Sequence, residues 1–133
     1  MTHTILLVED DRWLAQMYQN ALQAGGWCKV LHAETADDAL ELLDANPTIE
    51  LLVLDMFLPE HNGVELLHEI ASYSDLNTLP VLILTSVSKH DFAMSEERWR
   101  HYGVVHYLYK PTTKPVDLVA EVKKQLVKQG ASA

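Results

Sequence analysis

Asp55 ends an apolar run in the segment LLVLDMFLPEHNG, where it is the first charged residue. An ionised carboxylate at the edge of a hydrophobic core is unfavourable unless nearby groups compensate its charge. Other polar residues also follow apolar runs: Glu9, Asp10 and Asp11 after ILLV, Thr85 and Ser86 after VLIL, and Lys110 after YLY. Together these residue types suit phosphoryl chemistry, which needs carboxylates for a cation, a nucleophile, and donors for the transferred oxygens.

Five short apolar runs predict the strands that would bring these side chains together. They cover residues 5–8, 29–33, 51–54, 81–85 and 104–109, and such runs are typical of parallel strands buried on both faces. Segments with helical spacing separate them, and alternating strands and helices indicate an α/β fold with right-handed crossovers. We therefore predict a single doubly wound (βα)5 domain with a five-stranded parallel sheet.

The helical segments differ in how clearly the sequence defines them. The first has an apolar stripe made of Leu14, Met17, Ala21 and Leu22, with the spacing of a core-facing helix. The segment between the fourth and fifth strands has a poor stripe and mixed charge. We predict a helix there from about Asp91, with Trp99 as a packing residue on it.

The carboxyl ends of parallel strands meet at one edge of the sheet, where open α/β sheets bind ligands. The residues expected to converge there are Glu9, Asp10, Asp55, Thr85 and Lys110. Clustered carboxylates repel one another and favour a cation, and Mg²⁺ or Mn²⁺ suits oxygen ligands and leaves positions open for a phosphate. Asp55 could then be a nucleophile toward a phosphoryl group, with Lys110 and Thr85 contacting the transferred oxygens.

Each of these residues also has a structural explanation when it is taken alone. Asp10 or Asp11 could cap the next helix, a threonine at a strand end is ordinary, and a lysine before a proline is usually solvated. Their occurrence together, in order at the ends of strands, favours the functional interpretation.

Length and composition limit the remaining possibilities. At 133 residues we expect one domain, with a core at about 4–128 and a tail at 129–133. With 19 acidic and 10 basic residues the net charge is −9, which argues against nucleic acid and anionic membranes as partners. Cys28 is the single cysteine, expected to be a small buried residue. The sequence shows neither a signal-peptide pattern nor a long apolar run, so we expect a cytoplasmic protein.

Four motifs carry a resemblance to a known family. In order along the chain, ILLVEDD, LLVLDMFLPEHNG, VLILTS and YLYKP are similar to the motif regions of the receiver domain of two-component response regulators. The resemblance covers about residues 4–128 and implies the flavodoxin-like strand order 2-1-3-4-5. It also implies that Asp55 is the phosphoacceptor, that Thr85 is a switch hydroxyl and that Lys110 is the site lysine. Tyr107 would be an aromatic switch that turns inward when Thr85 moves, and Lys110-Pro111 would be a cis peptide.

The resemblance further implies the metal ligands. Asp10 and Asp55 would bind Mg²⁺ directly, Glu9 would act through water, and the backbone carbonyl of Phe57 would be another ligand. Pro59 and Gly63 match the loop that follows the phosphorylated residue in this family.

The family's partners and chemistry follow from the same resemblance. A histidine kinase or histidine phosphotransfer protein would donate the phosphoryl group. A downstream protein would bind the face made by the fourth helix, fifth strand and fifth helix, and neither nucleic acid nor a membrane is expected as a partner. We expect a signalling phosphoacceptor that contributes to its own phosphotransfer and dephosphorylation, rather than an enzyme. Phe57 and Val87 are apolar at positions that tune water access in the family, so we expect slow self-dephosphorylation.

Three other interpretations fit the sequence less well. A haloacid dehalogenase-type phosphatase has its nucleophilic aspartate after the first strand and a second aspartate two residues later. Here Asp55 follows the third predicted strand, and the residue two positions later is Phe57. A flavodoxin-like FMN protein would have its phosphate repelled by EDDRW. A receiver-like interaction module that works without phosphorylation would be expected to lack an acidic, threonine or lysine site residue, and none is missing here. Whether the chain is a single-domain regulator or part of a longer regulator or hybrid kinase stays open.

Overall fold

A five-stranded parallel sheet forms the centre of the computed structural model, which describes residues 2–58, 62–92 and 94–131. The strands are β1 (His3–Val8), β2 (Cys28–Ala33), β3 (Leu51–Leu54), β4 (Val81–Thr85) and β5 (Val104–Tyr109). The helices between and after them are α1 (Arg12–Gln23), α2 (Ala36–Ala45), α3 (Gly63–Ser72), α4 (Glu96–His101) and α5 (Pro115–Ala131). The strand order is β2-β1-β3-β4-β5, so the predicted fold class and order are confirmed.

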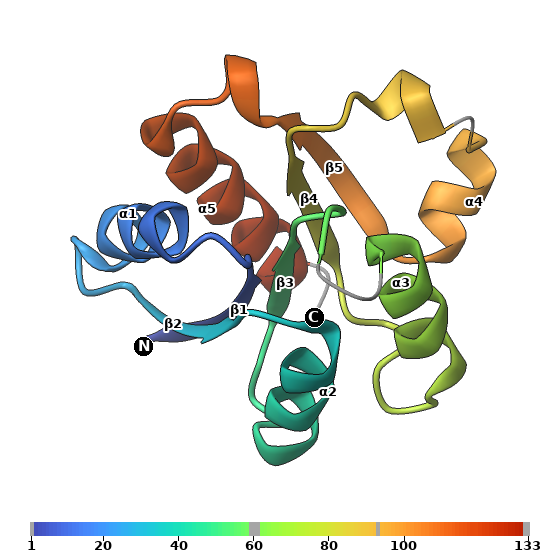
Figure 1. The fold of residues 1–133 in the computed structure, drawn as a ribbon. Helices are drawn as coiled ribbons and strands as arrows, with labels where there is room; N and C mark the ends of the chain where they lie inside the picture. Colours follow the sequence, from blue (N-terminus) through green and yellow to red (C-terminus); the bar gives the residue numbers. More distant parts are fainter. Residues whose placement is uncertain (1, 59–61, 93, 132–133) are drawn as a thin grey trace.

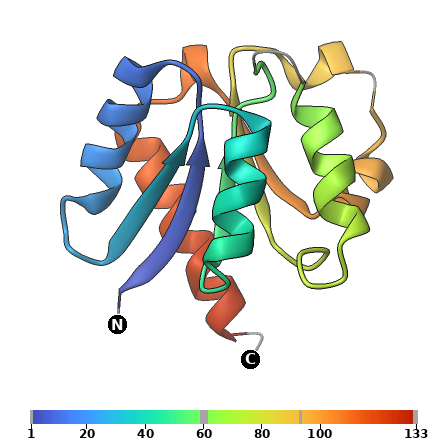
Figure 2. The ribbon, with the colours of Figure 1, turned by 60° about the horizontal axis from the view of Figure 1, so that its bottom comes forward.

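Helices cover both faces of the sheet (Figures 1 and 2). Alternate residues of a strand point to opposite faces, and β1 shows this clearly. Ile5 and Leu7 pack with α1 and α5, whereas Leu6 and Val8 pack with α2, α3 and α4. The central strands β3 and β4 are buried at every position, which explains their continuous apolar runs, whereas the edge strands β2 and β5 are partly exposed.

The apolar stripe predicted for α1 is partly wrong. Met17 is 41% exposed, and the buried residues are Ala15, Tyr18 and Leu22. This set also has helical spacing, but it pairs a small residue with a tyrosine and so gives a weaker hydrophobic pattern. Asp11 caps the helix by accepting a hydrogen bond from the backbone N–H of Leu14 (3.1 Å), as the structural explanation for the acidic triplet allowed.

The helix before β5 begins later than predicted. Residues Lys89–Phe92 form a short 3₁₀ helix, and α4 begins at Glu96. Ser95 explains this start, because its hydroxyl accepts a hydrogen bond from the backbone N–H of Arg98 (3.1 Å). Trp99 is fully buried, so its predicted packing role is confirmed.

The last helix extends further along the chain than the core expected from the sequence. The last helix α5 continues to Ala131, beyond the residue 128 boundary of the expected core. Cys28 is buried, as predicted.

Pro59 lies outside the described residues. Every helix in the described part of the chain falls short of the length and apolar character that crossing a membrane requires.

Candidate functional site

Backbone hydrogen bonds place two acidic residues side by side at the carboxyl edge of the sheet. The N–H of Glu9 donates to the carbonyl oxygen of Ala33 at the end of β2 (3.0 Å). The N–H of Asp55 donates to the carbonyl oxygen of Val8 at the end of β1 (3.0 Å). Because β1 and β3 are neighbours in the sheet, the residues that follow them must lie next to each other.

Asp55 accepts hydrogen bonds on both of its carboxylate oxygens. Thr85 Oγ1 lies 2.7 Å and the backbone nitrogen of Phe57 lies 3.0 Å from Oδ1. Lys110 Nζ lies 2.8 Å from Oδ2. The Asp55 side chain is only 5% exposed, so these three donors replace the water that would otherwise solvate it. These three hydrogen bonds compensate the negative charge of Asp55 at the end of an apolar strand.

Lys110 also joins Asp55 to Glu9, because Nζ donates to Glu9 Oε1 as well. Burial by itself lowers the pKa of Lys110, but the hydrogen bonds to Asp55 and Glu9 outweigh it and hold that pKa above its ordinary value. Burial raises the pKa of Glu9 to about 7, and the neighbouring Asp55 charge adds to this rise, whereas the hydrogen bond from Lys110 opposes it. One ammonium therefore serves two buried carboxyl groups, which leaves the site short of positive charge.

A divalent cation fits this arrangement. Carboxylate oxygens of Glu9, Asp10 and Asp55 all lie within 4.8 Å of one another. Hard oxygen donors with excess negative charge are the ligands that Mg²⁺ prefers. Glu9 and Asp55 are buried while Asp10 is exposed, so one side of such an ion would face solvent. Phe57 follows directly in the turn after Asp55, and the role of its carbonyl as a ligand stays a prediction.

The two predicted switch residues lie on neighbouring strands. Thr85 ends β4, is fully buried and bonds Asp55. Tyr107 on β5 is half-buried, and its hydroxyl donates to the carbonyl oxygen of Val87 (2.5 Å). Burial raises the pKa of Tyr107, so this hydroxyl keeps its proton. The Tyr107 ring packs edge-on against Trp99, with ring centroids 5.6 Å apart.

The expectation of a cis peptide bond between Lys110 and Pro111 is wrong. None of the described peptide bonds is cis, so Lys110-Pro111 is trans. Residues Lys110–Thr112 form a 3₁₀ turn closed by a hydrogen bond from the N–H of Thr113 to the carbonyl oxygen of Lys110 (3.1 Å). This turn accommodates a trans bond while Lys110 still reaches the carboxylates.

Sequence reasoning missed several residues that hold the acidic segment in place. His32 Nε2 lies 2.7 Å from the carbonyl oxygen of Glu9. The N–H of Asp11 donates to Glu9 Oε2 (3.2 Å), and Arg12 pairs with Glu34 (2.5 Å). The contacts of His32 with Glu9 and of Arg12 with Glu34 join segments at the ends of different strands, more than 20 residues apart. Spacing along the chain therefore gave no signal for them.

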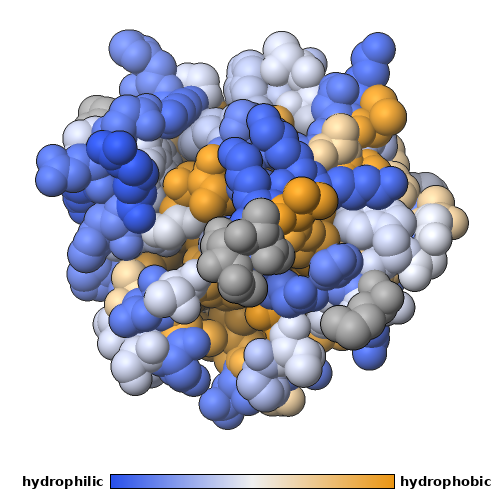
Figure 3. Space-filling model, turned by 180° about the vertical axis from the view of Figure 1, so that it is seen from behind, coloured by the Kyte–Doolittle hydropathy of each residue, from blue (hydrophilic) through white to orange (hydrophobic). Residues whose placement is uncertain are grey.

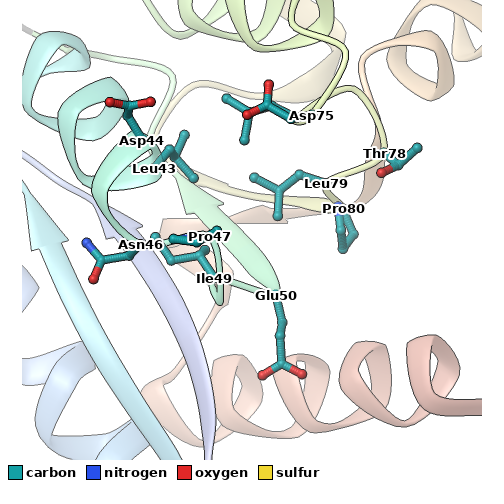
Figure 4. A pocket seen from close by; sticks show the side chains of 11 residues that line it. Leu43, Asp44, Asn46, Pro47, Ile49, Glu50, Asp75, Thr78, Leu79 and Pro80 are labelled. Carbon is teal, nitrogen blue, oxygen red and sulfur yellow. The ribbon is translucent and has the colours of Figure 1, made fainter.

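A cavity of about 260 Å³ opens at the other end of the sheet, where β3 and β4 begin. Leu43, Asp44, Ile49, Glu50 and Leu79 are among the residues that line it (Figure 4). None of the predicted site residues lines this cavity, so it has no part in chemistry at Asp55.

Comparison with known proteins agrees with the geometry. A family model described as the response regulator receiver domain matches residues 5–123. The chain belongs to this family. Chemotaxis protein CheY1 from Helicobacter pylori is 30% identical to this receiver domain, over 84% of this chain and 88% of that protein. The polar-differentiation response regulator DivK from Brucella ovis is 28% identical, over 86% of this chain and 89% of that protein.

Solved structures show the same architecture. A CheY-like receiver domain protein from Methanospirillum hungatei superposes with a TM-score of 0.85 over the full length of both chains, and its 24% identity makes this a likeness of fold alone. The receiver domain of a signal transduction histidine kinase from Syntrophus aciditrophicus has a TM-score of 0.79 and 28% identity, over 96% of this chain and 92% of that one. Similar receivers thus occur in proteins with different names and contexts, so family membership does not specify the partner of this one.

Proposed function

We propose that this receiver domain accepts a phosphoryl group on Asp55 from a phosphohistidine of a histidine kinase or histidine phosphotransfer protein, in a reaction that needs Mg²⁺ or Mn²⁺. The observation that carries the proposal is the environment of Asp55. Its buried carboxylate bonds Thr85 and Lys110 on opposite oxygens, and Glu9 and Asp10 complete an acidic cluster beside it.

The residues of this chain have distinct tasks in the transfer. An oxygen of the ionised Asp55 attacks phosphorus, and the phosphorus–nitrogen bond breaks with its electron pair returning to the donor imidazole. Lys110 keeps its charge beside the reacting oxygens, and the Thr85 hydroxyl can turn from Asp55 to a phosphoryl oxygen. A bound Mg²⁺ would neutralise the carboxylates and offer a position for a phosphoryl oxygen. The domain thus acts as a phosphoacceptor rather than as an enzyme with a separate substrate.

The residues next to the site favour a long-lived phosphoaspartate. Phe57, which is 71% exposed, lies two residues after Asp55, and the half-buried Val87 lies two residues after Thr85. Neither side chain can accept a hydrogen bond from an attacking water and orient it. We therefore propose slow self-dephosphorylation in the absence of a partner.

A chain of contacts offers a route from Asp55 to the surface. Thr85 bonds Asp55, and Val87, two residues later, accepts the hydrogen bond of Tyr107. Tyr107 in turn packs against Trp99 of α4. A Thr85 hydroxyl that moves toward a phosphoryl group would disturb Val87 and bias the position of Tyr107, and with it the face of α4, β5 and α5. We propose that a downstream protein binds this face.

The donor protein needs a surface close to Asp55. Trp13, in the first turn of α1, is 89% exposed, and Phe57 is exposed beside the site. Exposed aromatic residues are common anchors in protein interfaces. We propose that these two side chains contact the donor protein.

The cytoplasmic location inferred from the sequence stays a prediction.

Intact-mass analysis with acetyl phosphate tests the proposed chemistry. We expect one added phosphoryl group in the presence of Mg²⁺, and none with chelator or in Asp55→Asn. Asp44→Asn is a matched control, because this aspartate lines the cavity at the other end of the sheet. Phosphorylation that persists in Asp55→Asn would contradict the assignment. No phosphorylation with either acetyl phosphate or a phosphohistidine donor would favour a module that signals by binding alone.

A further inference from the structure

A groove lies at the edge of the sheet where β1 and β2 begin. Its volume is about 460 Å³, and it is lined by His3, Gly25, Trp27, Lys123, Leu126 and Val127. His3 begins β1, Trp27 directly precedes β2, and the last three residues lie on α5. Glu9 follows the other end of the six-residue strand β1, so the groove is about 20 Å from the acidic site.

The lining of the groove is mainly apolar. Val127 is 71% exposed although it adjoins the buried Leu126. Gly25 helps to shape the groove, because a Cβ at this position would lie 2.9 Å from Cδ1 of Trp27 and would displace the indole ring. This edge of the sheet faces the viewer in Figure 3, where apolar surface lies among hydrophilic side chains.

Positive charge borders the groove in an otherwise acidic chain. Lys123 Nζ lies 5.0 Å from the centroid of the Trp27 ring, in a cation–π arrangement. Within the part of the chain that the structure describes, Lys123 has no carboxylate partner. The net charge of the chain is −9, so this lysine beside the groove is a local exception to its overall sign.

We propose that the groove is a second docking site, which binds a segment of a partner protein that combines an apolar side chain with a neighbouring carboxylate. The apolar side chain would lie between Trp27 and Val127, and the carboxylate would pair with Lys123. Charge complementarity favours an acidic occupant, because Lys123 has no carboxylate partner among the residues that the structure describes. A small molecule fits less well, since small-molecule sites enclose most of their ligand whereas Val127 is mostly exposed.

The proposed docking site is separate from the phosphorylation site at Asp55 and would serve a different purpose. About 20 Å of sheet separates the two, so a segment bound in the groove would not touch a phosphoryl group on Asp55, and we expect its affinity to be independent of phosphorylation. The docking site would hold the partner near the domain, and the phosphorylation state would be read elsewhere.

A peptide titration followed by NMR tests the proposal. The probes are an acetylated and amidated Asp-Leu-Phe-Glu peptide and its neutral counterpart Asn-Leu-Phe-Gln, added to about 5 mM, because a single anchor and one exposed ion pair are worth only millimolar affinity. We expect saturable shifts of the Trp27 indole N–H signal with the acidic peptide, and at least threefold weaker binding of the neutral one. The dissociation constant should be the same with and without acetyl phosphate and Mg²⁺.

Matched variants separate the groove from general surface effects. Lys123→Gln and Val127→Ser should each weaken binding about three- to tenfold. The controls are Lys114→Gln and Val116→Ser, since Lys114 is an exposed lysine just before α5 and Val116 is 67% exposed on the same helix. Controls that weaken binding as much as the groove variants, or no saturable shift at all, would overturn the proposal. Binding to anionic lipid vesicles without peptide binding would also overturn it, in favour of a membrane contact.

Discussion

Replacing Lys110 with methionine keeps a side chain of similar length but removes the ammonium that lies between two carboxyl groups. The Glu9 and Asp55 side chains that it contacts are 2% and 5% exposed, so water does not readily take its place. Removing one partner of a buried ion pair usually lowers the free energy of unfolding by about 3–5 kcal/mol. Glu9 can limit the loss by binding a proton, so we expect about 3 kcal/mol at pH 8, at the lower end of that range.

Proton binding by Glu9 makes this loss depend on pH. Burial holds the pKa of Glu9 at about 7 in the folded wild type, above its ordinary value of 4.5. When the pKa of a carboxyl group is higher in the folded than in the unfolded protein, its contribution to stability falls as the pH rises from the unfolded-state pKa to the folded-state pKa. The hydrogen bond from Lys110 lowers this pKa, so its removal raises the pKa further and extends the window above pH 7. The variant and wild type should therefore differ least near pH 5 and most near pH 8.

Urea unfolding followed by circular dichroism, at about pH 5 and about pH 8, measures both effects. Lys114→Met is the control, because Lys114 is exposed and should tolerate the change. Mg²⁺ should restore part of the lost stability in Lys110→Met, since the cation compensates the same carboxylates. If Lys110→Met and Lys114→Met unfold at the same urea concentration at pH 8, Lys110 does not compensate these charges and the reasoning is wrong.

Three further changes test other parts of the structure. Thr85→Val removes the hydroxyl that donates to Asp55, and it should lower the free energy of unfolding by about 1.5–3 kcal/mol and slow phosphorylation. Thr85→Ser keeps a hydroxyl and should keep most of the phosphorylation rate. Equal phosphorylation rates in the two variants would contradict a role for the hydroxyl. Gly103→Ala should destabilise the fold more than Gly26→Ala in thermal unfolding, because both have positive φ but only the Cβ at Gly103 would meet a backbone atom, the carbonyl oxygen of Leu79 at 2.8 Å. Burial raises the pKa of Cys28 to about 11, so a disulfide reagent at pH 8 should label it slowly in the folded protein and rapidly in urea; rapid labelling of the folded protein would mean that Cys28 is accessible.

Local patterns in the sequence determined most of the architecture of this receiver domain. Strands buried on both faces need apolar residues throughout, so their positions can be read from short runs such as ILLV and VLIL. Polar residues just after such runs stand at the carboxyl edge of the sheet by construction. The sequence therefore predicted that Asp55, Thr85 and Lys110 would meet, and the structure brings them within hydrogen-bonding distance.

Helix faces and boundaries were less accessible to the same reasoning. The buried face of α1 includes Ala15 and Tyr18 rather than Met17, because a helix side chain is buried by what packs against it and not by its own hydrophobicity. The start of α4 depended on Ser95 and on a single buried tryptophan, Trp99. Six residues of mostly charged helix carry too little periodicity to mark either end.

Only the tertiary structure decided how one charge is shared within the site. Lys110 bonds Glu9, 101 residues away in sequence, and Asp55, 55 residues away. The groove between Trp27 and Val127 likewise arises where α5 packs beside the turn before β2. Sequence patterns report which face of an element is apolar, whereas such contacts depend on the distance and register between elements. Those are set by how the whole core packs, because residues distant in the chain share no local signal.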